Sequence, residues 1–347
     1  MIEVNVMAHP LSTAIQRAEI ALKLLGNTKR AALAMLLFLL LALFSAAAQE
    51  SVSAIPQTPG ASAAGQAVAV NRAQFQSHSS DVLSYWYGAT YRTPFVMVPG
   101  SGKAANIARN SIEYTHVGSA GMLSNFADVT VGMSDMSEPA ASGGSGATEA
   151  YVILREGIGL NELTHSSAFK MGPLRNIAFE MGANLETKNS SFAPAERTLY
   201  IGPKFVFALP KGFFNVGMHF RKEWNHEGVL GKAENYTPDF NIEPNWMVPF
   251  RVGKAQLAFS GFAEYNSPKG KDSFGSESVS EYLVRSVVAL DIGSVLIHKP
   301  QLLDLNGGLW YWHNEYGKPA SDPGAKQLTP FVGITLHLGA GQARHNP

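Results

Sequence analysis

The chain has 347 residues, of which 46% are hydrophobic and only 16% are charged, below the roughly 25% of an average protein. Lys and Arg together number 27, and so do Asp and Glu, so no basic surplus indicates a nucleic-acid partner. The absence of cysteine excludes disulfides, thiolate-bound metals and a cysteine nucleophile.

The N-terminal segment has the pattern of a secretory signal peptide. Lys29 and Arg30 precede the apolar run AALAMLLFLLLALFSAAA, which ends in small residues. A basic flank, an apolar run and an Ala-x-Ala site are typical of such signals. We therefore interpret residues 1–48 as a signal peptide with an extended n-region, cleaved before Gln49. The alternative is an uncleaved anchor, because the run reaches the roughly 18 apolar residues that a spanning helix needs.

Residues 49–80 are rich in Ala, Ser, Gly, Gln and Pro and have no apolar period. This composition predicts a flexible linker. Short alternating runs separated by Gly, Pro, Asn, Asp and Ser then follow. They give about twelve strands of about ten residues, longer than the usual five or six and long enough to cross a bilayer when tilted. The predicted strands are 82–92, 106–116, 125–134, 148–156, 175–187, 197–208, 212–224, 238–248, 254–265, 282–292, 302–313 and 328–339.

Each strand has one apolar and one polar face, as the stretch FFNVGMHFRKEWN shows. Phe214, Met218 and Phe220 fall on one face, and His219 and Arg221 on the other. Such a strand fits either a soluble sandwich or a membrane barrel. Pro203 and Pro244 fall inside predicted strands and count against the barrel, because each removes a ladder donor. Both lie on the apolar face, where a bulge could absorb them.

Loop lengths favour the barrel. Connections near 93–105, 135–147, 188–196, 225–237, 266–281 and 314–327 are mostly long, whereas the connections between them, such as 249–253, are mostly short. Long extracellular loops and short periplasmic turns are the pattern of outer-membrane barrels. The exception is 157–174, which is too long for a plain turn: either it holds a short helix, or the strand prediction beside it is wrong. The fold class is therefore all-β, with an antiparallel transmembrane barrel of about twelve strands over residues 81–339 and a tail over 340–347.

Several strand phrases resemble those of the nucleoside-specific, Tsx-like channel family of the outer membrane. They are YWYGATYRTPF (85–95), IEYTHVG (112–118), NFADVTVGMSD (125–135), TKNSSFAPAERTLYIGPKF (187–205) and GFFNVGMHFRKEWNHEG (212–228). The resemblance implies a twelve-stranded monomeric barrel that passes nucleosides and related solutes. The chain departs from that family at its end, where GAGQARHNP follows the last strand instead of a terminal aromatic residue.

The polar face holds the candidate solute path. It carries charges of both signs, which a dry core could not hold unpaired, and aromatic rings on which a base could stack. The candidates are Trp86, Arg109, Glu113, Asp128, Arg155, Glu180, Tyr200, Arg221, Glu223, Glu264, Arg285 and Trp310. The alternative for Trp310 is an interfacial girdle, because a slip of one residue exchanges the two faces.

These patterns predict a passive outer-membrane channel for nucleosides or similar small polar solutes, with the bilayer and those solutes as its partners. We expect no cofactor, no metal and no nucleic acid. Two other hypotheses stay open: a closed barrel with a structural or surface-binding role, and a barrel with an enzyme site on its rim. The motifs GxSxG and HExxH are absent, and GSGKAAN (100–106) lacks the spacing of a phosphate loop.

The signal peptide gives a direct test. The protein extracted from the outer membrane should begin near Gln49 when it is sequenced from its N-terminus. Recovery from the inner membrane with residues 31–48 still attached would contradict this and favour an anchor.

Overall fold

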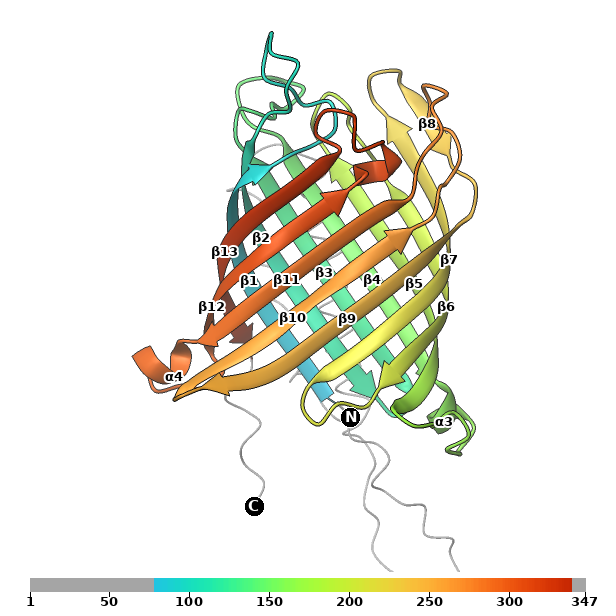
Figure 1. The fold of residues 1–347 in the computed structure, drawn as a ribbon, viewed down its shortest axis with the longest axis vertical. Helices are drawn as coiled ribbons and strands as arrows, with labels where there is room; N and C mark the ends of the chain where they lie inside the picture. Colours follow the sequence, from blue (N-terminus) through green and yellow to red (C-terminus); the bar gives the residue numbers. More distant parts are fainter. Residues whose placement is uncertain (1–77, 339–347) are drawn as a thin grey trace, which may run out of the picture. The chain divides into compact units, whose positions relative to one another are not determined.

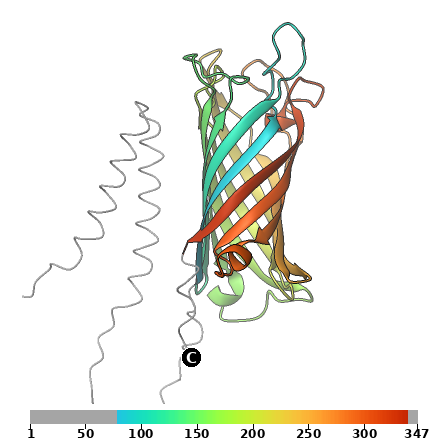
Figure 2. The ribbon, with the colours of Figure 1, turned by 90° about the vertical axis from the view of Figure 1, so that its left-hand side faces the viewer.

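The computed structural model describes residues 78–338 (Figures 1 and 2). The predicted signal peptide, nearly all of the predicted linker and the predicted tail lie outside the described residues. The strands are β1 His78–Tyr91, β2 Ile107–Ala120, β3 Leu123–Ser134, β4 Thr148–Gly159, β5 Leu174–Lys188, β6 Arg197–Phe207, β7 Phe213–Glu227, β8 Lys232–Asn235, β9 Asp239–Val252, β10 Ala255–Asn266, β11 Glu281–Asp291, β12 Leu303–His313 and β13 Lys326–Leu338. The short helical turns are α3 Leu160–Leu163, α4 Gly293–Leu296 and η2 Glu315–Gly317.

Twelve of these strands close into an antiparallel barrel. Neighbours in the chain pair with each other, β7 pairs with both β6 and β9, and β1 pairs with β13 through Tyr85↔Ile334. The four-residue β8 pairs only with the end of β7. Closure leaves no free edge in the wall, since each barrel strand has two partners. The predicted fold class and strand number are confirmed.

The two ends of the barrel differ (Figure 1). Longer connections, 92–106, 135–147, 189–196, 228–238, 267–280 and 314–325, gather at the end that carries β8. The other end carries turns at 121–122, 208–212 and 253–254, together with the connections that hold α3 and α4. Long loops mark the extracellular end of an outer-membrane barrel, so the end with α3 and α4 is periplasmic.

The outer face is apolar and the inner face polar. On β7, Phe220 is 71% exposed, whereas His219 is 0% and Arg221 5% exposed. Along β13, Leu328, Val332 and Ile334 are likewise exposed between buried neighbours. An oily exterior around a charged interior is the arrangement of a barrel in the bacterial outer membrane. The apolar face of FFNVGMHFRKEWN therefore faces lipid.

Aromatic rings mark the extracellular border of the lipid-facing surface. Tyr265, Tyr282 and His313 lie side by side on β10, β11 and β12, with ring centroids 5.2 and 6.2 Å apart, and Tyr311 stacks on His313. Such a girdle is usual where the barrel meets the headgroups. Trp310 is not part of it, because its outward-facing neighbour is Leu309, 48% exposed. The face predicted for Trp310 is therefore the one observed.

The structure differs from the prediction at several points. β1 begins at His78, so residues 78–80 belong to a strand and not to the linker; their strand is stabilised by pairing with β2. The register is continuous through Pro203 and Pro244, so neither proline needs a bulge. The pairing is interrupted at Pro203 on the side of β7 and at Pro244 on the side of β10. Residues 157–174 hold the short helix α3, one of the two alternatives for this segment, and β4 extends to Gly159; β8 and α4 were not predicted.

Among the described residues, no helix is both long and apolar enough to cross a membrane.

The face assignment gives a test on β7. Phe220 lies midway along the strand, and Arg on the lipid face near the midplane costs about 2–4 kcal/mol. Phe220→Arg should therefore lose most of its assembled barrel, seen as loss of the heat-modifiable band on a detergent gel. Phe220→Leu, the matched control, should assemble normally. Equal assembly of both variants would contradict a lipid-facing Phe220.

Candidate functional site

All twelve candidate residues lie on the inner face of the barrel. Eight are buried, and Arg109, Glu264, Arg285 and Trp310 are partly buried. The buried ones are Trp86, Glu113, Asp128, Arg155, Glu180, Tyr200, Arg221 and Glu223. The alternation of each strand brings them to one interior, because every second side chain points inward. Their part in solute passage stays a prediction.

Two ion pairs cross the lumen. Arg155 on β4 donates from Nη2 to Oε2 of Glu243 on β9 at 2.8 Å, and Arg285 on β11 donates from Nη1 to Oε2 of Glu113 on β2 at 2.7 Å. Neither pair joins neighbouring strands. Both bridges therefore join separate parts of the wall and narrow the space between them.

The Arg285 bridge carries an aromatic layer. Its guanidinium lies 4.7 Å from the ring centroid of Trp86 and 5.6 Å from that of Phe331. The rings of Trp86 and Phe331 pack edge to face with each other. Val287 belongs to the same buried cluster, and Trp310 packs against it. A cation over an aromatic face gains electrostatic stabilisation in a desolvated site. The bridge is thus held both by its carboxylate and by the rings around it.

The Arg155 bridge is surrounded by hydrogen-bonding groups. Its guanidinium lies 4.2 Å from the ring centroid of Tyr200 and donates to Asn184 at 2.8 Å. Asn184 in turn donates to the hydroxyls of Tyr151 and Tyr200, at 2.8 and 3.1 Å. Gly182 lies opposite Arg155 on β5, where a Cβ would come within 2.6 Å of Arg155 Cδ. The glycine therefore leaves the space that the arginine side chain occupies.

A chain of side-chain contacts runs along the wall from Glu180 to the extracellular mouth. The Glu180 carboxylate contacts Nε2 of His219 at 3.2 Å, and Nδ1 of His219 contacts Asn241 at 2.9 Å. Asn241 donates to Asn266 at 2.8 Å, and Asn266 donates to Glu281 at 3.4 Å. Lys204 pairs with Glu180 at the other end. Buried polar groups are thus satisfied by one another across six strands.

One ion cluster at the mouth is held by a loop. Glu138, from the loop 135–147, forms ion pairs with Lys188 at 2.5 Å and with Arg109 at 3.4 Å. Glu149 pairs with both cations, at 3.5 Å from Arg109 and 3.1 Å from Lys188. Glu138 is only 1% exposed although it belongs to a loop. The loop is therefore anchored inward over the lumen.

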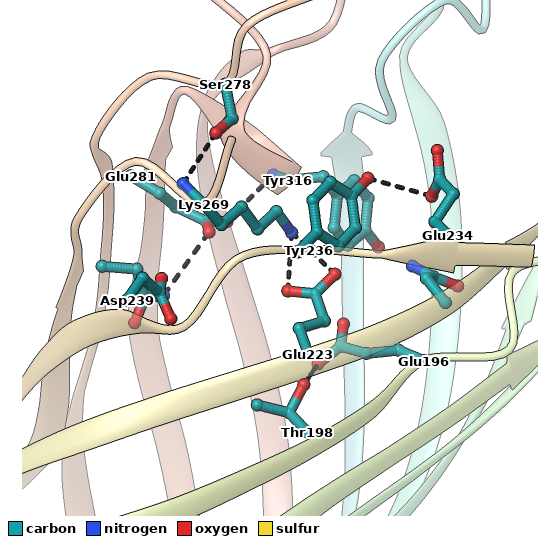
Figure 3. A network of polar contacts seen from close by, with 12 residues as sticks. Glu196, Thr198, Glu223, Glu234, Tyr236, Asp239, Lys269, Ser278, Glu281 and Tyr316 are labelled. Atoms are coloured by element: carbon teal, nitrogen blue, oxygen red, sulfur yellow. Dashed lines mark hydrogen bonds and ion pairs between the residues drawn. The ribbon is translucent and has the colours of Figure 1, made fainter. Parts of the chain in front are cut away.

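A second cluster holds the loop 267–280 in the same way (Figure 3). Lys269 turns into the barrel and donates to both carboxylate oxygens of Glu223, at 2.7 and 2.6 Å. Its ammonium lies 4.3 Å from the ring centroid of Tyr236. Below it, Arg221 donates to both oxygens of Asp239 at 3.0 and 3.1 Å. Each of these two loops is thus anchored to the barrel wall at the mouth by a buried charge.

Sequence reasoning missed Glu138 and Lys269, and it did not single out His219 or Asn241. The two strand residues were detectable, since both fall on the polar face of their strands. The two loop residues carry no such signal, because a loop has no period that tells an inward charge from a solvated one. Among the described residues, no group of His, Asp and Glu side chains has the arrangement of a metal site.

Glu196 gives a pH test of the mouth. Burial raises the pKa of this loop carboxyl to about 7, and repulsion from Glu223 adds to the rise. A folded-state pKa above the unfolded one means that the folded protein holds the proton more tightly, so ionisation of Glu196 costs stability as pH rises from about 4.5 to about 7. The melting temperature of Glu196→Gln should therefore exceed that of the wild type at about pH 8 and differ little at about pH 4. Glu277→Gln, which removes a carboxylate with a 69% exposed side chain, is the control and should follow the wild type.

No known protein family and no curated protein matches the sequence. Among solved structures, the chain is similar to the translocator domain of the autotransporter NalP from Neisseria meningitidis, with 12% identity over 75% of this chain and 88% of that one, at a TM-score of 0.40. It is also similar to the NanC porin, with 11% identity over 75% and 100% of the two chains and a TM-score of 0.37. It is similar as well to the KdgM porin, with 8% identity over 74% of this chain and 98% of that one, at a TM-score of 0.36. These proteins are outer-membrane β-barrels and none belongs to a nucleoside-specific family; identities and TM-scores this low carry no argument about the function of this chain.

Proposed function

We propose that the protein is a narrow outer-membrane channel for small polar solutes, with nucleosides as the first class to test. The observation that carries this is the inner face, which presents charges of both signs and aromatic rings from one end of the barrel to the other. A closed barrel without transport needs only a packed interior, and apolar residues would fill it at lower cost than buried ions. The Tsx-like strand phrases support nucleosides within the class of polar solutes.

The Arg155 region offers the groups that a nucleoside needs. Tyr200 would present an aromatic face to the base once the Arg155 guanidinium, 4.2 Å from its ring centroid, moves away, and stacking on such a face is worth roughly 1–3 kcal/mol in single-strand binders. Arg155 can donate to base carbonyls, while Glu264 can accept from ribose hydroxyls. Binding through a few hydrogen bonds and one ring is weak. Weak binding suits a channel, since conduction requires release as well as entry.

The lumen bridges set the expected size of the current. Arg155 would have to leave Glu243, or a solute would have to pass beside the pair, because the bridge joins β4 to β9 across the interior. We therefore expect small conductance steps, unlike those of a wide aqueous pore. The same bridge favours the second candidate, a closed barrel that acts through its extracellular loops.

Planar-bilayer recording separates the two candidates. The purified wild-type protein should give small conductance steps. Arg155→Ala should give larger conductance steps, because it removes the side chain that bridges the lumen to Glu243. Lys271→Ala, which removes a cation with a 64% exposed side chain, is the control and should leave the steps unchanged. A folded, heat-modifiable protein that shows no steps in either the wild type or Arg155→Ala would overturn the channel and favour the closed barrel.

The choice of solute has its own test at Tyr200. Uridine should reduce the wild-type current, and Tyr200→Leu should weaken that effect because the stacking face is lost. Tyr200→Phe keeps the face and loses only the hydroxyl that accepts from Asn184, so it should retain most of the effect. Equal block by uridine in all three proteins would reject Tyr200 as a nucleoside contact while leaving the channel intact.

A further inference from the structure

Two buried carboxylates lie opposite each other below the extracellular mouth. Glu186 is near the end of β5, and Glu196 immediately precedes β6; the backbone N–H of Glu186 donates to the carbonyl of Glu196 at 3.0 Å. Both side chains point inward and are buried, at 3% and 7% exposure. Like charges at directly opposed positions of a sheet repel each other and destabilise it.

Neither carboxylate forms an ion pair within the described part of the chain. The carboxylate of Glu186 forms no hydrogen bond there, and its Oε1 is fully buried. Glu196 accepts only from the hydroxyl of Thr198, at 2.6 Å (Figure 3). Two nearby cations are paired with other carboxylates, Lys188 with Glu138 and Glu149, and Lys269 with Glu223. Arg197 donates to the backbone carbonyls of Glu186 and Glu196 and not to their carboxylates.

An unpaired buried carboxylate is expensive. Leaving one ion of a buried pair without its partner typically costs several kcal/mol. Several other lumen clusters of the described barrel, by contrast, contain a cation that pairs with their carboxylates. A buried carboxylate left without a partner is a place where a functional reason is expected.

An aromatic residue borders the carboxylates. Tyr151 lies directly opposite Glu186 in the pairing of β4 with β5, so the two side chains project from the same face of the sheet. A carboxylate beside an aromatic face is a setting that binds organic cations.

We propose that Glu186 and Glu196, with Tyr151, form a binding site for a solute that carries a protonated amine. As the substrate class of the channel, this rests on the proposed function; as a site, it can be tested without transport. A metal ion is the weaker alternative, because the described side chains here do not form a group of three metal ligands. An amine supplies a positive charge, donates hydrogen bonds to both carboxylates and places its carbon chain against the Tyr151 ring.

Equilibrium titration of the detergent-solubilised barrel tests the site. The probe is putrescine, with 1,4-butanediol as its uncharged analogue of similar length, at about pH 8, where unpaired carboxylates are normally ionised. Putrescine should bind and butanediol should not. Glu186→Gln keeps the shape and removes the charge, so the affinity for putrescine should fall about tenfold or more, since a hydrogen bond to a charged group is worth about 1.5–3 kcal/mol. Glu196→Gln should behave similarly.

The controls make each outcome decisive. Glu277→Gln removes an exposed carboxylate from the same end of the barrel and should bind putrescine as the wild type does. Heat-modifiable mobility shows that each variant is assembled. Absence of putrescine binding, equal binding of butanediol, or unchanged affinity in Glu186→Gln would overturn the amine site.

The outcome is also separable from that of the channel. Titration in detergent needs no conduction, so putrescine binding that depends on Glu186 in a protein without current would retain the site and reject the channel. Conductance steps in a protein that does not bind putrescine would retain the channel and reject the site.

Discussion

A sheet that crosses a bilayer must satisfy all of its own backbone hydrogen bonds, because the hydrocarbon offers no partner for an N–H or a C=O. In this protein the requirement is met by the pairing of β1 with β13, which turns a linear meander into a ring. Once the ring is closed, each strand has one face in lipid and one face inside. The side-chain period of two then decides where every charge of the wall must go.

The interior follows from this constraint. Charged side chains excluded from the lipid face share a narrow space, and they are stable there because almost all of them find a partner. Arg155 finds Glu243 on the far wall, and Arg285 finds Glu113. Inward glycines such as Gly182 leave room for the long side chains between them. Glu186 is an exception, since its buried Oε1 has no hydrogen-bond partner and its carboxylate forms no ion pair.

The sequence predicts the wall well and the mouth poorly. Strand positions, strand number and the face of each strand follow from alternation, and residues such as Phe220 and Arg221 lie where their positions in the pattern place them. Pairing across the lumen is not encoded locally, because Arg155 and Glu243 are separated by several strands. The inward turn of Lys269 depends on the fold of an irregular loop, for which neither period nor spacing gives a signal. The solute-binding roles of the inner residues are likewise not predictable from local sequence, since they depend on side chains from several strands at once.

The bridges across the lumen also bear on the mechanical behaviour of the barrel. A ring of strands joined only by backbone hydrogen bonds can flatten into an ellipse. Small changes of angle between neighbouring strands are enough for this, and they leave most of the hydrogen bonds between those strands intact. Arg155–Glu243 and Arg285–Glu113 each join strands that such flattening would move apart or together. Because these ion pairs lie in a desolvated interior, salt screens them far less than it screens surface pairs. The cross-section of this barrel is thereby fixed by its own ions, and lateral pressure from the surrounding lipid has little freedom to change it.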